Sequence, residues 1–311
     1  MKKILVTGGA GYIGSKLVTK LLNINFEVTV IDKLNFSRNS LDHLSGRKNF
    51  NFIKGDVRNK TIMKKLIRKN EFIIPLAALV GAPLCEKNKK EAISVNYDSI
   101  KLLMQLINKK SKIIYLTTNS GYGVGTKNKY CDENSPLNPI SLYGKTKVKS
   151  EKVIMEFKNS IGFRLATVFG NSYRMRSDLM VNNFVLNSLR KRQLIIYEPN
   201  FRRNFIHIND VVDAIIYSIK NFSKLKSNIY NLGLSSANLT KYMLAKKIKK
   251  KLKYLKIKIV KNKKDPDQRD YYVSNKKIEK KGFKAKISLE QGIDELIYTF
   301  LHTNEKIINN Y

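Results

Sequence analysis

The stretch at residues 1–14, MKKILVTGGAGYIG, decides the fold that we expect for the rest of the chain. Residues 4–7 (ILVT) form a short apolar run suited to a buried parallel strand, and apolar residues recur at helical spacing over 17–22. The glycines therefore stand where a strand turns into a helix. Glycine there lets a pyrophosphate approach the backbone, and the first helical turn offers free N–H groups to it. The stretch predicts a dinucleotide-binding turn, with an ordinary glycine-rich turn as the alternative.

An acidic residue follows at the spacing that such a turn requires. Residues 27–31 (EVTVI) predict a second strand, and Asp32 stands at its end, eighteen residues beyond Gly14. A carboxylate there accepts hydrogen bonds from the ribose hydroxyls of adenosine and repels a 2′-phosphate, which favours NAD over NADP. Lys33 and Arg38 weaken this preference, because either could meet a phosphate.

Further apolar runs predict strands over 50–57, 71–78 and 112–118, separated by helical patterns. This alternation predicts an α/β fold, a doubly wound parallel sheet of the Rossmann type with ligands at the carboxyl ends of the strands. Asp56 could accept from the adenine amino group or cap the helix that starts near Asn59. Ala77 and Ala78 allow close contact with a cofactor.

A candidate catalytic group combines Thr118, at the end of a predicted strand, with Tyr143 and Lys147. A tyrosine and a lysine four residues apart share one face of a helix. A nearby ammonium group favours the phenolate, so such a tyrosine could take a proton from a sugar hydroxyl, while the Thr118 hydroxyl holds that group. Lys145 and Lys149 are expected to be surface lysines.

The composition excludes some other classes of protein. The chain has 311 residues, two cysteines and no CxxC motif, so we expect a reduced, cytoplasmic setting. No signal peptide, membrane segment or metal site is expected. The net charge of +36 comes from lysines scattered over the whole chain, including residues 246–264, which predict an amphipathic helix and then a strand. We therefore expect no specific nucleic-acid partner, although a positive field would attract an anionic sugar nucleotide.

Nearly the whole chain resembles the extended short-chain dehydrogenases/reductases of the NAD-dependent epimerase/dehydratase family. The resemblance is carried by TGGAGYIG (7–14), GDV (55–57), YGKTK (143–147), FRLATVFG (163–170), RNFIHINDV (203–211) and ISLEQGI (287–293). Four runs look most like the branch that oxidises C4 of GDP-D-glycero-α-D-manno-heptose on routes to surface polysaccharides: residues 73–85, 118–125, 163–170 and 232–241.

The resemblance implies an NAD-dependent enzyme that acts on a nucleotide sugar and forms a homodimer. It implies catalytic roles for Thr118, Tyr143 and Lys147. The implied cofactor contacts are Gly8, Gly11, Tyr12, Ile13, Gly14, Asp32, Asp56, Val57, Leu76, Ala77, Ala78, Asn96, Thr117, Tyr143, Lys147 and Phe169. The implied substrate contacts are Asn183, Arg203 and Arg269. Val80, Gly81, Asn119, Ser120, Arg174 and Arg176 are further candidate substrate contacts from the residues themselves. The alternatives are a buried hydrophobic turn for residues 80–83 and ordinary surface charge for the two arginines.

The chain departs from the family pattern after Thr118. Family members that eliminate water carry Asp-Glu there, whereas this chain has Asn119-Ser120, neither of which is an acid or base at neutral pH. Dehydration is therefore not expected. The same three catalytic residues would serve a 4-epimerase or a 4-keto reductase equally well. A non-catalytic NAD-sensing or RNA-binding protein is a more remote alternative.

Two interleaved domains are expected. A cofactor domain takes residues 1–168 and 205–231, and a substrate domain takes 169–204 and 232–311. His207 is expected to be a strand residue rather than a base, Asp210 to cap a helix over 211–219, and the tail from 304 to be frayed.

Overall fold

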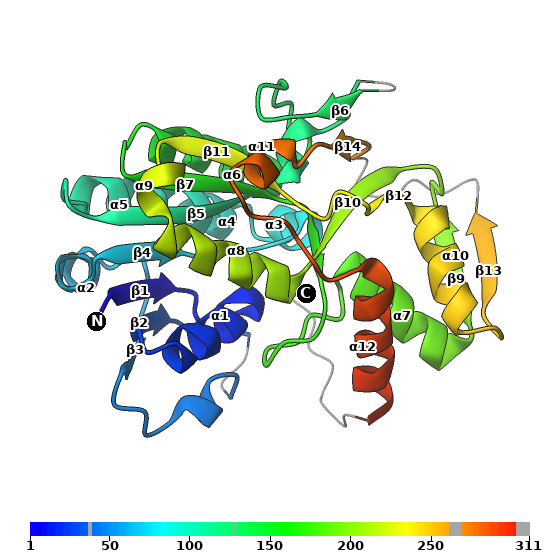
Figure 1. Ribbon diagram of the computed structural model, residues 1–311, viewed down its shortest axis with the longest axis horizontal. Coiled ribbons are helices and arrows are strands. Elements are labelled where there is room, and N and C mark those ends of the chain that lie inside the picture. The colour runs from blue at the N-terminus through cyan, green and yellow to red at the C-terminus, as the bar shows by residue number, and fades with distance from the viewer. Residues whose placement is uncertain (37–38, 127–128, 261–268, 303–311) are drawn as a thin grey trace.

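The computed structural model describes residues 1–36, 39–126, 129–260 and 269–302. Arg38, residues 265–268 and the tail from 304 therefore lie outside the described residues. A large α/β unit occupies the left of Figure 1, and a smaller lobe with α7, α10, α12, β9 and β13 occupies its right.

A seven-stranded sheet forms the large unit, in the order β11-β7-β5-β4-β1-β2-β3, and all of its neighbouring strands are parallel. This order confirms the Rossmann prediction, because the chain winds outward in both directions from β1. Its strands are β1 (Lys3–Thr7), β2 (Glu27–Asp32), β3 (Phe50–Lys54), β4 (Phe72–Pro75), β5 (Lys112–Thr118), β7 (Ser160–Leu165) and β11 (Asn228–Leu232).

Helices cover both faces of this sheet, which explains why the central strands are apolar throughout. In β1, Ile4 and Val6 join the core under α1 and α8, whereas Leu5 joins the core under α2, α5 and α6. The helices of the large unit are α1 (Tyr12–Asn23), α2 (Lys60–Lys69), α3 (Ala82–Lys87), α4 (Lys89–Ile93), α5 (Ser99–Leu106), α6 (Leu142–Met155), α8 (Ile208–Lys220), α9 (Phe222–Leu225) and α11 (Lys276–Lys280).

The second lobe is built around short sheets. β10 (Arg202–His207) pairs with β8 (Thr167–Phe169) and β12 (Asn238–Thr240), β13 (Lys256–Val260) pairs with β9 (Gln193–Tyr197), and β14 (Tyr272–Val273) pairs with β6 (Tyr130–Cys131). Its helices are α7 (Met180–Lys191), α10 (Lys241–Lys251) and α12 (Leu289–His302). In its described part, residues 246–260, the lysine-rich run is thus a helix followed by a strand, as predicted. We expected the chain to return to the cofactor domain at residue 205. In the structure this position lies inside β10, a strand of the three-stranded sheet.

Asp210 does not cap α8, and that prediction is wrong. The helix begins at Ile208, and the side chain of His207 accepts the hydrogen bond from Asn209 N at its start. The Asp210 carboxylate instead accepts from the backbone N–H groups of Lys286 and Ile287, each at 3.0 Å. Asp210 therefore ties α8 to the segment that leads into α12.

Candidate active site

A cavity of about 260 Å³ opens at the carboxyl ends of the central strands. The glycine-rich turn after β1 forms one end, and the start of α6 with the end of β5 forms the other. Of the predicted site residues, those that line it are Gly8, Gly11, Tyr12, Ile13, Gly14, Leu76, Ala78, Val80, Gly81, Thr117, Thr118, Ser120, Tyr143, Lys147, Arg174, Arg176 and Arg269. Residues from both lobes thus meet around one space.

The glycine-rich turn leaves no room for side chains. Gly8 has a φ of +69°, and a Cβ atom there would stand 2.6 Å from the backbone nitrogen of Ala77. A Cβ atom on Gly14 would stand 2.5 Å from the carbonyl oxygen of Gly8. The exits of β1 and β4 therefore touch through their backbones, which is the close approach that the glycine pattern predicts.

Asp32 joins the end of β2 to this turn. Its carboxylate accepts from Ala10 N at 3.0 Å and from Leu34 N at 2.8 Å, and burial raises its pKa. Its side chain does not line the cavity. In the structure the carboxylate orders the loop, and its contact with an adenosine ribose stays a prediction.

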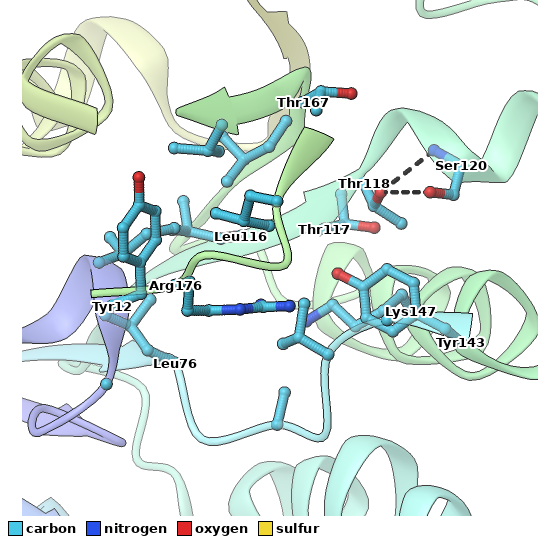
Figure 2. A pocket seen from close by; sticks show the side chains of 18 of the residues that line it. Tyr12, Leu76, Leu116, Thr117, Thr118, Ser120, Tyr143, Lys147, Thr167 and Arg176 are labelled. Atoms are coloured by element: carbon cyan, nitrogen blue, oxygen red, sulfur yellow. Dashed lines mark hydrogen bonds between the residues drawn. The ribbon is translucent and has the colours of Figure 1, made fainter. Parts of the chain in front are cut away.

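Helix α6 brings Tyr143 and Lys147 to the cavity. The Ser141 hydroxyl caps its start by accepting from Gly144 N at 3.2 Å, so the tyrosine lies in the first turn. Among the three neighbouring lysines, only Lys147 is buried, whereas Lys145 and Lys149 are exposed as predicted. Figure 2 shows Tyr143 and Lys147 projecting from α6 into the cavity, with Thr118 beyond them.

Thr118 stands at the last position of β5 and faces the same space. Its hydroxyl is 2.9 Å from the hydroxyl of Ser120 and accepts from Ser120 N at 3.1 Å, as the dashed lines in Figure 2 mark. Arg269, on the other lobe, donates to the Ser120 hydroxyl. The end of β5 is therefore linked through Ser120 to a guanidinium group of the substrate lobe.

Burial and charge act in opposite directions on the tyrosine. Burial raises the pKa of Tyr143 to about 12, while the guanidinium groups of Arg176 and Arg269 and a hydrogen bond with Thr118 oppose that rise. Figure 2 shows Arg176 extending across the cavity toward Tyr143. The cations that favour the phenolate here are thus two arginines that a Tyr-x-x-x-Lys pattern does not contain.

Lys147 is held in an apolar site. Burial lowers its pKa to about 7, opposed by the Glu151 carboxylate one helical turn away. Its Nζ lies 4.1 Å from the ring centre of Tyr115. Glu151 is itself paired with the buried Arg164, at 2.7 Å between Oε1 and Nη2. An amine with a pKa near neutrality can accept or donate a proton at physiological pH.

The cavity is cationic. Lys147, Arg174, Arg176 and Arg269 line it, and no carboxylate does among the residues that the structure describes. Such a lining suits ligands that carry phosphate groups.

The sequence of residues 4–233 matches the model of the NAD dependent epimerase/dehydratase family. The chain belongs to this family. A putative UDP-glucose 4-epimerase of Methanocaldococcus jannaschii is 27% identical over 97% of this chain and 99% of its own length. The dTDP-D-glucose 4,6-dehydratase of Homo sapiens is 26% identical over 95% of this chain and 89% of its own length.

Solved structures agree with the fold. The UDP-glucose 4-epimerase of Thermotoga maritima with UDP-glucose superposes with a TM-score of 0.85 at 25% identity, over 97% of this chain and all of that one. The enzyme is therefore an NAD-dependent member of the epimerase/dehydratase family. Relatives with different reactions match about equally well, so the family does not specify the reaction.

Several residues predicted to contact NAD lie outside the cavity. The Asp56 carboxylate pairs with Arg58 and Lys33, which hold its pKa well below the usual range. Asn59 rather than Asp56 caps α2, since its side chain accepts from Ile62 N. The buried Asn96 pairs with both backbone groups of Leu79, so it orders the exit of β4. The other predicted NAD contacts outside the cavity are Val57, Ala77 and Phe169, which pack in or against the hydrophobic cores.

Three residues predicted to contact the substrate also lie outside the cavity. Arg203 is fully buried in β10, and its Nη1 donates to the carbonyl oxygens of Arg202 and Arg269, so it supports the segment that carries Arg269. Asn119 is buried beside Thr118 but does not reach the cavity. Asn183 pairs with Asn187 along α7.

Sequence reasoning missed Asn182, Phe36 and Tyr271. Asn182, buried inside α7, accepts from Gly170 N and donates to the carbonyl of Arg176, so it shapes the loop between β8 and α7. A polar residue among apolar neighbours in a helix was the available signal. Phe36 and Tyr271 line the cavity, but nothing in their sequence context distinguishes them from other loop aromatics.

No helix in the described ranges is long and apolar enough to cross a membrane. The described part of the chain likewise contains no cluster of His, Cys, Asp or Glu that could hold a metal ion.

Proposed function

We propose that this enzyme catalyses the NAD-dependent oxidation of the C4 hydroxyl of a nucleotide sugar. The observation that carries the proposal is the meeting of Thr118, Tyr143 and Lys147 at one end of a cavity whose other end is the glycine-rich cofactor turn. When bound there, NAD supplies the acceptor for a hydride.

Each of the three residues then has a role. The Tyr143 oxygen accepts the proton of the sugar hydroxyl, and the Thr118 hydroxyl orients that group by hydrogen bonding. Lys147, with a pKa lowered to about 7, relays a proton to or from the site and, as the resemblance implies, contacts the nicotinamide ribose. Arg176 and Arg269 favour the ionised form of Tyr143 from the opposite side.

The lining argues against dehydration. Elimination of water needs a group that removes a proton from carbon and a group that protonates the leaving hydroxyl. No carboxylate lines the cavity within the described ranges, and Ser120 is engaged by Thr118 and Arg269. The reaction we propose therefore ends at a 4-keto sugar.

We propose a GDP-heptose as the substrate, on the way to a surface polysaccharide. Support comes from the resemblance of residues 73–85, 118–125, 163–170 and 232–241 to enzymes that act on GDP-heptoses. The cationic lining fits any nucleoside diphosphate, so it supports the substrate class rather than the base. A cytoplasmic homodimer, usual for the family, is part of the same proposal.

A 4-epimerase is the second candidate. It is favoured by the 4-epimerase names of a sequence relative and of a superposing structure. An epimerase would retain the keto sugar, rotate it and return the hydride to its other face with the same three residues. The two functions thus share the first half of the reaction.

Mass spectrometry of products distinguishes the candidates. The purified protein would be incubated with NAD and, separately, with GDP- and UDP-sugars that include a GDP-heptose. Loss of two hydrogen atoms from a GDP-heptose supports the proposal. A product of unchanged mass and altered stereochemistry would identify an epimerase, and loss of water would contradict both.

A further inference from the structure

The loop between β8 and α7 is fastened to the start of α1. The Tyr12 hydroxyl donates to the Gly170 carbonyl at 2.7 Å, and the Ser172 hydroxyl donates to the Tyr12 carbonyl at 2.6 Å. The ring of Tyr173 stacks on His43 with centroids 3.9 Å apart. The residue that follows, Arg174, therefore has a fixed backbone position over the first turn of α1.

Arg174 lines the cavity with buried nitrogen atoms that lack hydrogen-bond partners among the described residues. Its side chain is 2% exposed, and its buried Nε and Nη2 atoms have no hydrogen-bond partner in the described part of the chain. Its guanidinium carbon lies 5.3 Å from the ring centre of Phe36, which follows β2. Burial and the nearby Arg176 lower the pKa of Arg174 to about 10.

The other two arginines of the cavity are already engaged. Arg176 forms an ion pair with Asp178, and Arg269 donates to Ser120 and Tyr271. Both also act on the pKa of Tyr143, whereas Arg174 acts on the pKa of Asp32 at the cofactor end. The three guanidinium groups are thus divided between the two ends of one cavity.

Buried guanidinium nitrogens without hydrogen bonds cost folding free energy, so their retention calls for an acceptor that is present when the enzyme works. Arg174 shares the cavity with Gly11 and Tyr12, where the free N–H groups of α1 and its positive dipole end attract phosphate. The pyrophosphate of a dinucleotide is the anion that this end of the cavity suits.

We propose that Arg174 is a ligand of the NAD pyrophosphate, holding it from the substrate lobe against the start of α1, and is not a ligand of the sugar nucleotide. The proposal rests on the NAD dependence of the family and is independent of the reaction proposed above. It changes the assignment of Arg174 from the substrate to the cofactor.

Calorimetric titration of NAD-free protein tests the proposal with three probes. NAD and ADP-ribose carry the pyrophosphate, and adenosine does not. For Arg174→Gln we expect the affinity for NAD and for ADP-ribose to fall about 10- to 100-fold, the loss of charge-assisted hydrogen bonds, with adenosine unchanged. Arg174→Lys keeps the positive charge but lacks the planar, two-pronged guanidinium group. Its affinity for NAD and ADP-ribose should therefore lie between the affinities of wild type and Arg174→Gln.

GDP, titrated into NAD-saturated protein, reports on the substrate end and should bind Arg174→Gln as it binds wild type. Arg47→Gln removes an exposed arginine of the segment after β2 and is the matched control, with no change expected for any probe. Weaker GDP binding with unchanged NAD and ADP-ribose binding would overturn the proposal and return Arg174 to the substrate.

Thermal unfolding separates ligation from a structural role. Because Arg174→Gln removes an unpaired buried charge, its NAD-free melting temperature should equal or exceed that of wild type, and the rise produced by NAD should shrink. A lower NAD-free melting temperature with wild-type affinity for all probes would show that Arg174 only stabilises the fold, which also overturns the proposal.

Discussion

The two ends of the cavity are built in different ways. The cofactor end consists mainly of backbone: a glycine-rich turn, the exits of β1 and β4, and the first turn of α1, joined by the side chain of Arg174. The catalytic and substrate end consists of side chains from α6, β5 and two loops of the second lobe, with Arg176 and Arg269 brought in from far along the chain. The difference indicates that the backbone part of the cofactor end forms with the sheet, whereas Arg174 and the substrate end require the two lobes to pack together.

The largest effect should come from the catalytic end. We predict that Tyr143→Phe lowers kcat by about 100- to 10,000-fold, because it removes the group that accepts the proton. Its affinity for NAD should stay within a factor of about two, since the glycine-rich turn is untouched. Steady-state kinetics and NAD titration measure the two quantities. Tyr298→Phe, on an exposed face of α12, is the control, and wild-type turnover in Tyr143→Phe would refute the assigned role.

The cofactor end can be broken without touching a reacting group. Gly8→Ala places a Cβ against the Ala77 backbone at a φ of +69°, so we predict a fall in the free energy of unfolding of more than about 1–3 kcal/mol and weaker NAD binding. Urea unfolding and calorimetry measure both. Gly46→Ala is the control, because it introduces the same backbone strain without a steric clash. Gly46 has a φ of +79°, and nothing lies within 4 Å of an added Cβ atom. Equal losses of unfolding free energy in the two variants would contradict the close contact between the backbones of Gly8 and Ala77.

Arg269→Gln should affect the substrate end alone. We predict a rise of about 10- to 100-fold in KM for the sugar nucleotide and an unchanged Kd for NAD, the reverse of Arg174→Gln. The ascending limb of the pH–rate profile should also move to higher pH, because Arg269 lowers the pKa of Tyr143, which must be ionised to accept the proton. Arg190→Gln, at an exposed position of α7, controls for the lost charge. A fall in NAD affinity equal to that of Arg174→Gln would show that Arg174 and Arg269 do not act at different ends of the cavity.

The smallest effect concerns pH and stability without NAD. The folded-state pKa of Lys147 is lowered to about 7, below its ordinary value of about 10.4, so the unfolded chain binds more protons between these values. This lysine therefore makes the free energy of unfolding rise with pH across that window. Lys147→Met should flatten the rise in urea titrations, and Lys145→Met, at an exposed position, should not. A flat wild-type profile that matches Lys147→Met would show that Lys147 is not desolvated.

The glycine-rich turn at the cofactor end could be predicted well from the sequence because backbone geometry depends on local residue type, whereas several of the predicted NAD contacts around it lie outside the cavity. Gly8, Gly14 and the strand-helix pattern around them were sufficient, and so was the spacing of Tyr143 and Lys147 on one helix. The substrate end was predicted less well because its residues are placed by packing between lobes. Arg203 looked like a phosphate ligand but is buried beneath Arg269, and Asn182, which shapes the loop of Arg174 and Arg176, gave only a weak signal.

Transfer of the C4 hydrogen is the most direct test of the central claim. The measurement is a single turnover of the NAD-loaded enzyme with a GDP-heptose deuterated at C4, followed by absorbance of the reduced nicotinamide and by mass spectrometry of cofactor and sugar. We predict that the deuterium moves to the cofactor, that its transfer is slower than that of hydrogen, and that the released sugar is a 4-ketone. Deuterium retained at C4 of an unreacted or dehydrated sugar, with no reduced cofactor formed at any point, would contradict the account.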